Sequence, residues 1–197
     1  MSNILKIVFL GLVGFSLLVF FTADKPKQIV ASENVVNIIK YDSLPSTFEL
    51  VGKNDLVKKE NLFEKNKKYL IVVGSHDSLA VVKELPNLFK LDIAYVMVAN
   101  ISAAPWFVKK MFIPGKLEEL NENSKTPMIY DFNGDMVNSL KVNDTSKTKF
   151  FAFLLTDVGT ISKIYDGEVK NGAIDGSMSK EEIISTLKPL VESLNNN

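Results

Sequence analysis

Residues 69–98 read YLIVVGSHDSLAVVKELPNLFKLDIAYVMV, and this stretch decides the fold. It begins with the apolar run Tyr69 to Val73 and ends with a second apolar run, Ile93 to Val98. Continuous runs of this kind are typical of strands that are buried on both faces of a sheet. Between them, apolar residues recur at helical spacing from Leu79 to Leu88, which predicts a helix over residues 78–91. Two buried strands joined by a helix predict a right-handed parallel βαβ unit.

Downstream of this unit, the sequence predicts another helix and another strand. Pro105 is placed like the first residue of a helix that continues through Phe112 and stops at Pro114-Gly115. A short strand is expected at Met128 to Tyr130, because the Asn133-Gly134 turn signal follows it.

The C-terminal part predicts a hairpin and a closing helix. The apolar run Phe150 to Leu155 and the run Thr160 to Tyr165 are separated by a short turn, as in an antiparallel hairpin. The last helix begins at Ser179, with Glu182 completing a capping box. Together these elements predict an α/β sandwich with a central mixed β-sheet flanked by helices.

The N-terminal part is organised differently. Residues 7–23, IVFLGLVGFSLLVFFTA, carry no charge, and this length is at the lower limit of roughly 17–25 for a spanning helix. A cleavage site needs small residues at −3 and −1, but Phe21 or Ile29 occupies the −3 position of the two candidate sites. We therefore expect an uncleaved signal-anchor at 1–24, a linker at 25–43 that leads into an edge strand, and a globular domain at 44–197.

Composition excludes several classes of function. The formal net charge is zero, so no basic excess is present to bind nucleic acid. The chain has no cysteine and one histidine, which excludes thiol catalysis, disulfides and cysteine-ligated metals and argues against a transition-metal site. Every one of the 23 basic residues is lysine, so arginine clamps are excluded too. This residue usage favours a bacterial source, and we expect a single-pass inner-membrane protein with an extracytoplasmic C-terminal domain.

Several short motifs, taken in order, carry a resemblance to a known superfamily. They are Leu44-Pro45 with Phe48-Glu49-Leu50, residues 67–73 (KKYLIVV), Lys83-Glu84-Leu85-Pro86, residues 126–134 (TPMIYDFNG) and Leu155-Thr156-Asp157-Val158-Gly159. In order and spacing they resemble the redoxin branch of the thioredoxin superfamily, which includes periplasmic thioredoxin-like and peroxiredoxin-like proteins. The resemblance covers roughly residues 44–193 and implies a thioredoxin-like fold.

The resemblance also implies where a site should lie, and there the sequence departs from the family. The two cysteines of the Cys-x-x-Cys motif fall on Ser78 and Val81, and Thr148-Lys149-Phe150 stands where the family has a cis-proline. Serine has a hydroxyl in place of a thiol, so it forms neither a thiolate nor a disulfide. Thiol-based redox activity is therefore excluded. The peptide bonds near residue 149 are expected to be trans. The resemblance places a vestigial binding position at His76, Asp77, Ser78, Val81, Lys149 and Phe150.

These residues admit more than one interpretation. Ser75-His76-Asp77-Ser78 contains the residue types of a hydrolase triad, but triad members converge from separate segments. The interpretation we favour is that Asp77 or Ser78 caps the helix and that His76 is a solvated loop residue. The main hypothesis is a membrane-tethered binding or assembly module without cofactor, with the membrane and a protein as partners. The alternative is a non-thiol enzyme or ligand carrier that uses a cleft around His76 and Ser78.

Two further features have both a structural and a functional interpretation. The aspartates at 131, 135, 144, 157 and 166 lack the spacing of a calcium loop, so turn and cap roles are expected. Trp106-Phe107 and Met111-Phe112 lie at helical spacing, which favours the core over an exposed docking surface for a partner or the membrane.

Overall fold

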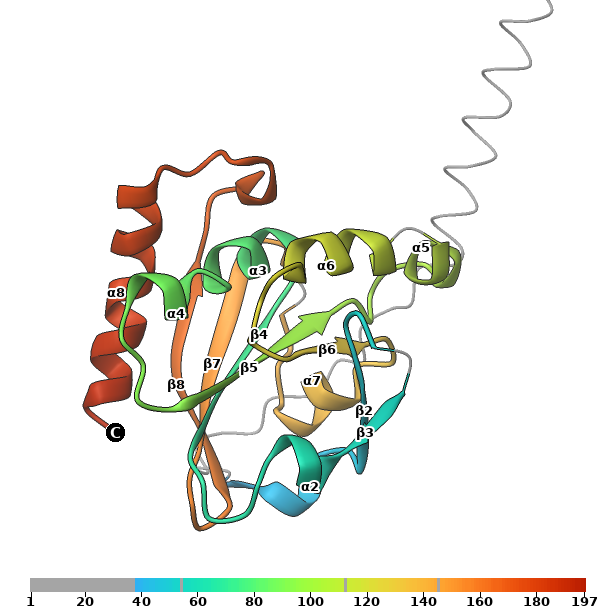
Figure 1. The fold of residues 1–197 in the computed structure, drawn as a ribbon, viewed down its shortest axis with the longest axis vertical. Coiled ribbons are helices and arrows are strands. Elements are labelled where there is room, and N and C mark those ends of the chain that lie inside the picture. Colours follow the sequence, from blue (N-terminus) through green and yellow to red (C-terminus); the bar gives the residue numbers. More distant parts are fainter. Residues whose placement is uncertain (1–37, 54, 112, 145) are drawn as a thin grey trace, which may run out of the picture.

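The computed structural model describes residues 38–197 except 54, 112 and 145 (Figure 1). The described residues form an eight-stranded sheet in the order β1-β8-β7-β4-β5-β6-β2-β3, with helices on both of its faces. No helix within this part of the chain has the length and apolarity needed to cross a membrane. The predicted anchor at 1–24 lies outside the described residues, as does the predicted linker up to residue 37.

The predicted βαβ unit forms the centre of the sheet. Strand β4 (Tyr69–Gly74) is buried along its whole length and runs parallel to β5 (Ala94–Asn100). The connection contains α3 (His76–Val82) and α4 (Leu85–Leu88) in place of the single expected helix. Pro86 lies in the first turn of α4, and proline has no N–H to bond a preceding turn, so the helix is interrupted before it.

The predicted C-terminal hairpin and closing helix are confirmed. Strand β7 (Lys149–Leu155) pairs antiparallel with β4 and with β8 (Thr160–Glu168). Helix α8 (Lys180–Asn195) begins with a capping box in which Glu182 N donates to Ser179 Oγ and Ser179 N donates to Glu182. On the other side of β4, the expected short strand forms β6 (Met128–Asp131), which lies parallel to β5.

The N-terminal part of the described chain supplies the edge strands of the sheet, β1 on one side and β3 on the other. Residues 39–43, in the described part of the predicted linker, form β1 (Ile39–Lys40), which pairs with β8, and the short helix η1 (Tyr41–Ser43). Strands β2 (Thr47–Leu50) and β3 (Leu56–Lys58) pair at the opposite edge, followed by α2 (Lys59–Leu62). The buried Lys59 ammonium donates to the carbonyls of Tyr41 and Leu44, which ties η1 to α2.

Two helices beyond β5 depart from the sequence expectations. Helix α5 (Trp106–Met111) is followed by α6 (Ile113–Asn121), so Pro114-Gly115 does not stop the helical segment. Pro114 lies in the first turn of α6, where the missing N–H has no partner to lose. The expected core position of Trp106 and Met111 is wrong, because both side chains are exposed.

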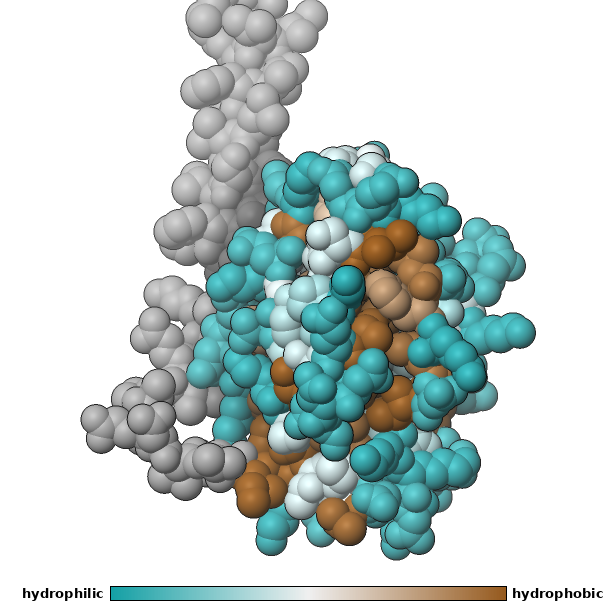
Figure 2. Space-filling model, turned by 90° about the vertical axis from the view of Figure 1, so that its left-hand side faces the viewer, coloured by the Kyte–Doolittle hydropathy of each residue, from teal (hydrophilic) through white to brown (hydrophobic). Residues whose placement is uncertain are grey.

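Strand alternation divides the core into two clusters, one on each face of the sheet. One cluster joins α3, α4, α6 and α8 to the sheet through residues such as Val81, Phe150 and Leu187. The other contains Phe63, Phe153 and Met136, with α2 and α7 (Asp135–Ser139). Figure 2 shows hydrophobic residues exposed between hydrophilic ones on the side that the left edge of Figure 1 presents.

Candidate functional site

The predicted site begins at the turn from β4 to α3. Ser75 is the N-cap residue of α3, rather than Asp77 or Ser78. The Ser78 hydroxyl reaches back to this cap: it accepts from Ser75 N at 2.9 Å and donates to Ser75 O at 3.0 Å. The Ser78 side chain is 0% exposed, and a Cβ added to Gly74 would overlap it. The hydroxyl is therefore closed off from solvent and fully used within the turn.

Asp77 has a structural role that the sequence did not indicate. Its buried carboxylate accepts hydrogen bonds from Gly172 N and Ile174 N, both at 3.2 Å. These two residues belong to the connection between β8 and α8, which contains the short helix η2 (Ala173–Asp175). Because two backbone donors lie against one buried carboxylate, Asp77 fastens this connection to the start of α3.

His76 does not complete a hydrolase triad. Its half-exposed ring places Nε2 4.0 Å from an Asp77 oxygen, beyond hydrogen-bond distance. The Ser78 hydroxyl bonds to the Ser75 backbone instead of to the imidazole. A catalytic base must reach the proton that it removes, so the three residue types are adjacent in sequence without forming a relay.

Val81 and Phe150 belong to the core. Both side chains are buried in the cluster on the α3 face. Phe150 lies opposite Gly74 on β4 and Gly167 on β8, and a Cβ added to Gly167 would overlap its ring. Just before β7, the Lys147 carbonyl accepts a hydrogen bond from Ser78 N at 3.3 Å. The loop before β7 is therefore bonded directly to the start of α3, and its described peptide bonds are trans, as expected.

Lys149 lies apart from the other predicted site residues. Successive side chains of a strand point to opposite faces of the sheet, so Lys149 lies on the face opposite to Phe150. Its ammonium is 2.8 Å from Asp144 Oδ2. The hydrogen bond from Lys149 holds the pKa of Asp144 below its ordinary value, and the Asp144 carboxylate raises the pKa of Lys149.

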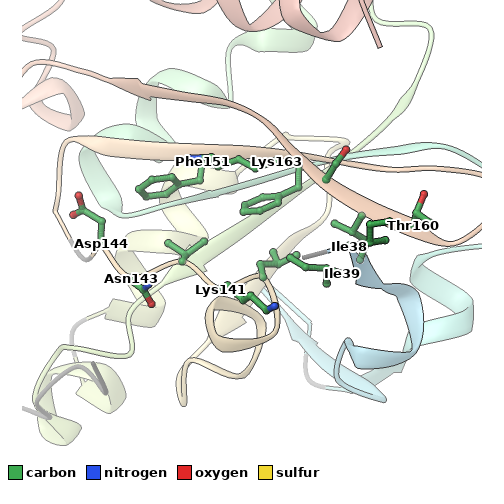
Figure 3. Close-up of a pocket in the computed structure, with 13 residues that line it drawn as sticks. Ile38, Ile39, Lys141, Asn143, Asp144, Phe151, Thr160 and Lys163 are labelled. Atoms are coloured by element: carbon green, nitrogen blue, oxygen red, sulfur yellow. The ribbon is translucent and has the colours of Figure 1, made fainter. Parts of the chain in front are cut away.

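The same face carries a groove that sequence analysis missed. It has a volume of about 900 Å³ and lies between β1, the β7–β8 hairpin and residues 140–144 (Figure 3). Ile39, Phe151 and Phe153 are among its apolar lining, and Lys141 and Lys163 line it as well. Its residues come from three separate parts of the sequence, so no local pattern could have indicated it. The predicted cleft around His76 and this groove lie on opposite faces of the sheet.

The predicted cap role of the aspartates is confirmed for Asp131. Its buried carboxylate accepts from Met136 N at 3.2 Å and from Val137 N at 2.9 Å, at the start of α7. Burial raises the pKa of Asp131, and these backbone bonds oppose that shift. Asp166 instead pairs with Lys163 at 2.6 Å. Each of these carboxylates has a hydrogen-bonding or ion-pairing role within the fold.

The arrangement of the central elements decides the fold. Strands β4 and β5 are parallel, β7 and β8 return antiparallel on the other side of β4, and α3 and α8 complete the unit. The fold is thioredoxin-like. This confirms the resemblance drawn from the motifs at the level of the fold.

Solved structures that are similar to this chain at low identity include the following. A secreted Mycobacterium tuberculosis disulfide oxidoreductase homologous to E. coli DsbE is 12% identical, covering 75% of this chain and 98% of its own, with a TM-score of 0.41. A thioredoxin-like protein from Porphyromonas gingivalis is 14% identical over 78% and 94%, also with a TM-score of 0.41. The Xanthomonas campestris bacterioferritin comigratory protein is 13% identical over 81% and 98%, with the same TM-score. No protein-family model and no curated protein sequence matches the chain.

The chemistry open to this thioredoxin-like chain differs from that of a thiol enzyme. With no cysteine in the sequence, the start of α3 can form neither a thiolate nor a disulfide. Ser78 would have to leave a closed turn before it could reach a substrate. The turn between β4 and α3 is thus a packed structural element in this protein.

Proposed function

We propose that this protein is a membrane-tethered, redox-inactive thioredoxin-like domain that acts as a binding or assembly module on the outer face of a bacterial cytoplasmic membrane. The observation that carries the proposal is Ser78, which the motif resemblance aligns with the nucleophile and which is 0% exposed and bonds to its own turn and the loop before β7. A site that is closed and fully hydrogen-bonded supports a structural use of the fold over a catalytic one.

The tether is proposed from the sequence of the N-terminal part. Residues 7–23 are apolar and uncharged, and no small residue occupies the −3 position of either candidate cleavage site. In this proposal the segment remains attached and holds the domain at the membrane through the linker.

Fractionation of cells that produce the full chain tests the tether. We expect the protein to resist alkaline carbonate extraction and the intact N-terminus to appear in the mass spectrum of the extracted protein. External protease should digest the domain in spheroplasts. A mature N-terminus near Asp24 or Ser32, or a carbonate-soluble protein, would show that the segment is a cleaved signal peptide.

The module function is tested by cross-linking in intact cells, followed by purification from solubilised membranes. We expect a defined protein partner to be recovered with the wild type and equally with His76→Ala. If His76→Ala instead abolishes the cellular phenotype of the protein while the domain stays folded, the non-thiol enzyme becomes the better explanation.

A second candidate, ligand carriage, is favoured by the groove over β7 and β8. Its volume of about 900 Å³ is in the range of small-molecule sites, which are commonly apolar with a few polar groups. The Lys163 ammonium lies 6.0 Å from the centre of the Phe151 ring at this groove. Native mass spectrometry of the purified protein should show a bound small molecule that is lost in Phe151→Asp. A protein that is ligand-free in the wild type after purification from its native membrane would count against carriage.

A further inference from the structure

Helix α5 has an unusual distribution of side chains. Trp106 is 61% exposed and Met111 is 74% exposed, whereas Lys109 of the same helix is only 8% exposed. Large apolar side chains are ordinarily buried and lysines ordinarily exposed. The helix therefore presents apolar residues to solvent although it contains a lysine that could have faced outward.

The exposed residues share one side of the helix. At 3.6 residues per turn, Trp106 is followed by Lys110 one turn on, and Phe107 by Met111. These four residues span a continuous sector, with Trp106, Lys110 and Met111 exposed and Phe107 half-buried. The Trp106 and Phe107 rings pack edge to face with centroids 6.3 Å apart. The outer face of α5 is thus an aromatic ridge with a methionine and one exposed lysine.

This composition matches what a bilayer surface binds. Tryptophan concentrates at the boundary between hydrocarbon and headgroups, where its ring is half apolar and its N–H is solvated. A lysine beside it is attracted to anionic headgroups. A protein partner could also use Trp106 and Met111, but the proposed tether keeps a membrane permanently at high effective concentration.

The length of the tether permits such a contact. Residues 25–37 lie between the predicted anchor and the first described residue, and 13 residues span at most ~43–47 Å. A domain of about 160 residues has a radius of gyration of ~15 Å and is therefore ~40 Å across. The α5 face can reach the bilayer even if the chain enters the domain on the far side.

We propose that the outer face of α5, formed by Trp106, Phe107, Lys110 and Met111, docks on the membrane surface and orients the domain. The proposal rests on the tether of the proposed function, which supplies the nearby bilayer. Docking would fix which faces of the domain are open to a partner. It would leave the opposite end, including the β7–β8 turn, directed away from the membrane (Figure 1).

Trp106 is the sole tryptophan of the chain, so its fluorescence reports on this surface alone. The full chain is reconstituted into phosphatidylcholine vesicles with or without phosphatidylglycerol, and into matched vesicles with brominated acyl chains. We expect a blue-shifted emission that brominated lipid quenches and that aqueous acrylamide quenches weakly. Emission typical of a water-exposed indole, unaffected by brominated lipid, would overturn the proposal.

Matched variants distinguish docking through α5 from a general effect of any exposed apolar side chain. Met111→Asp should lower the ratio of docked to free domain about tenfold, because it replaces an inserted apolar side chain by a charge. Val158→Asp changes an equally exposed apolar residue in the β7–β8 turn and should leave quenching unchanged. Lys110→Gln should remove about a fivefold preference for vesicles containing phosphatidylglycerol. Equal effects of Met111→Asp and Val158→Asp would contradict the assignment.

The experiments also test the docking proposal and the tether proposal independently of each other. Carbonate extraction and the N-terminal mass report on the tether, whereas lipid quenching reports on α5. A tethered protein without quenching overturns the docking proposal alone. If Trp106 shifts only in native membranes and not in vesicles of pure lipid, the α5 face binds a protein and the lipid proposal is wrong.

Discussion

The carboxylate of Asp77 lies 3.2 Å from the backbone nitrogen of Gly172, a residue 95 positions later in the chain. A second bond reaches Ile174 N at the same distance. These contacts join the start of α3 to the connection that leads into α8. The position next to Ser78 is therefore occupied by a long-range structural contact.

Removing this contact should destabilise the fold. In Asp77→Ala, the N–H groups of the half-buried residues Gly172 and Ile174 lose their acceptor, and each lost hydrogen bond costs about 0.5–1.5 kcal/mol. Urea denaturation would measure the loss, with Asp157→Ala as the control because Asp157 is exposed in the β7–β8 turn. Equal stabilities of the two variants would show that the Asp77 bonds contribute nothing.

Glycine substitutions should have opposite effects at two positions. In Gly167→Ala, the new Cβ would lie 2.6 Å from Cε1 of the fully buried Phe150 ring. We expect a loss of about 1–3 kcal/mol. Gly115 lies in α6 with nothing within 4 Å of its added Cβ, so Gly115→Ala should stabilise by about 0.5–1 kcal/mol. Thermal unfolding would reveal the signs, and a stable Gly167→Ala would contradict the tight packing around Phe150.

Cysteines at Ser78 and Val81 would test the alignment of these positions with the Cys-x-x-Cys motif. Ser78 and Val81 lie three residues apart in α3, where Cβ atoms are ~5–6 Å apart, whereas a disulfide needs ~3.5–4.5 Å. We expect Ser78→Cys with Val81→Cys to form a disulfide under mild oxidation after a small shift of the first turn.

The readout must take burial into account, since both side chains are closed to solvent in the fold. The oxidised protein should be unfolded before treatment with a thiol-alkylating mass tag, with the Ser78→Cys single variant as control. The double variant should take up no tag and the single variant one. Two tags on the double variant would show that the positions do not meet.

The ion pair between Lys149 and Asp144 gives a pH-dependent prediction. The hydrogen bond from Lys149 lowers the pKa of Asp144 from its ordinary value of 3.8, so Lys149→Met should raise it. A carboxyl group whose pKa is lowered by folding stabilises the fold above its unfolded pKa. That contribution is lost as the pH falls through the lowered pKa. Carbon-detected NMR titration of Asp144 would measure the change, and Lys163→Met, which alters a different pair, should leave this pKa unchanged.

Local sequence patterns predicted an element correctly where a single run of residues determines that element. The runs at 69–73 and 150–155 form β4 and β7, and Ser179 with Glu182 begins α8 as the capping box indicates. Patterns failed where a proline was expected to end a helix or was overlooked inside one. The helix after β4 breaks before Pro86, which has no N–H for a preceding turn, and α6 accommodates Pro114 in its first turn.

At the candidate site, too, the sequence predicted some features and only the folded chain determined others. Ser78 and Val81 could be placed at the cysteine positions from the resemblance, but their burial comes from the packing of α3 on the sheet. The position of Lys149 on the other face of the sheet follows from strand alternation in β7. The groove beside Phe151 needs β1, the β7–β8 hairpin and residues 140–144 together. No segment of sequence contains all three.

The sequence by itself determined the absence of thiol chemistry, because a chain without cysteine has no thiolate to offer whatever its fold. It also determined the central βαβ unit, because β-branched runs and helical spacing act through neighbouring residues. Only the tertiary structure decided that Asp77 holds the η2 connection, that Ser78 is closed to solvent and that α5 turns Trp106 outward. Each of these depends on residues brought together from distant parts of the chain, and burial is a property of the assembled fold.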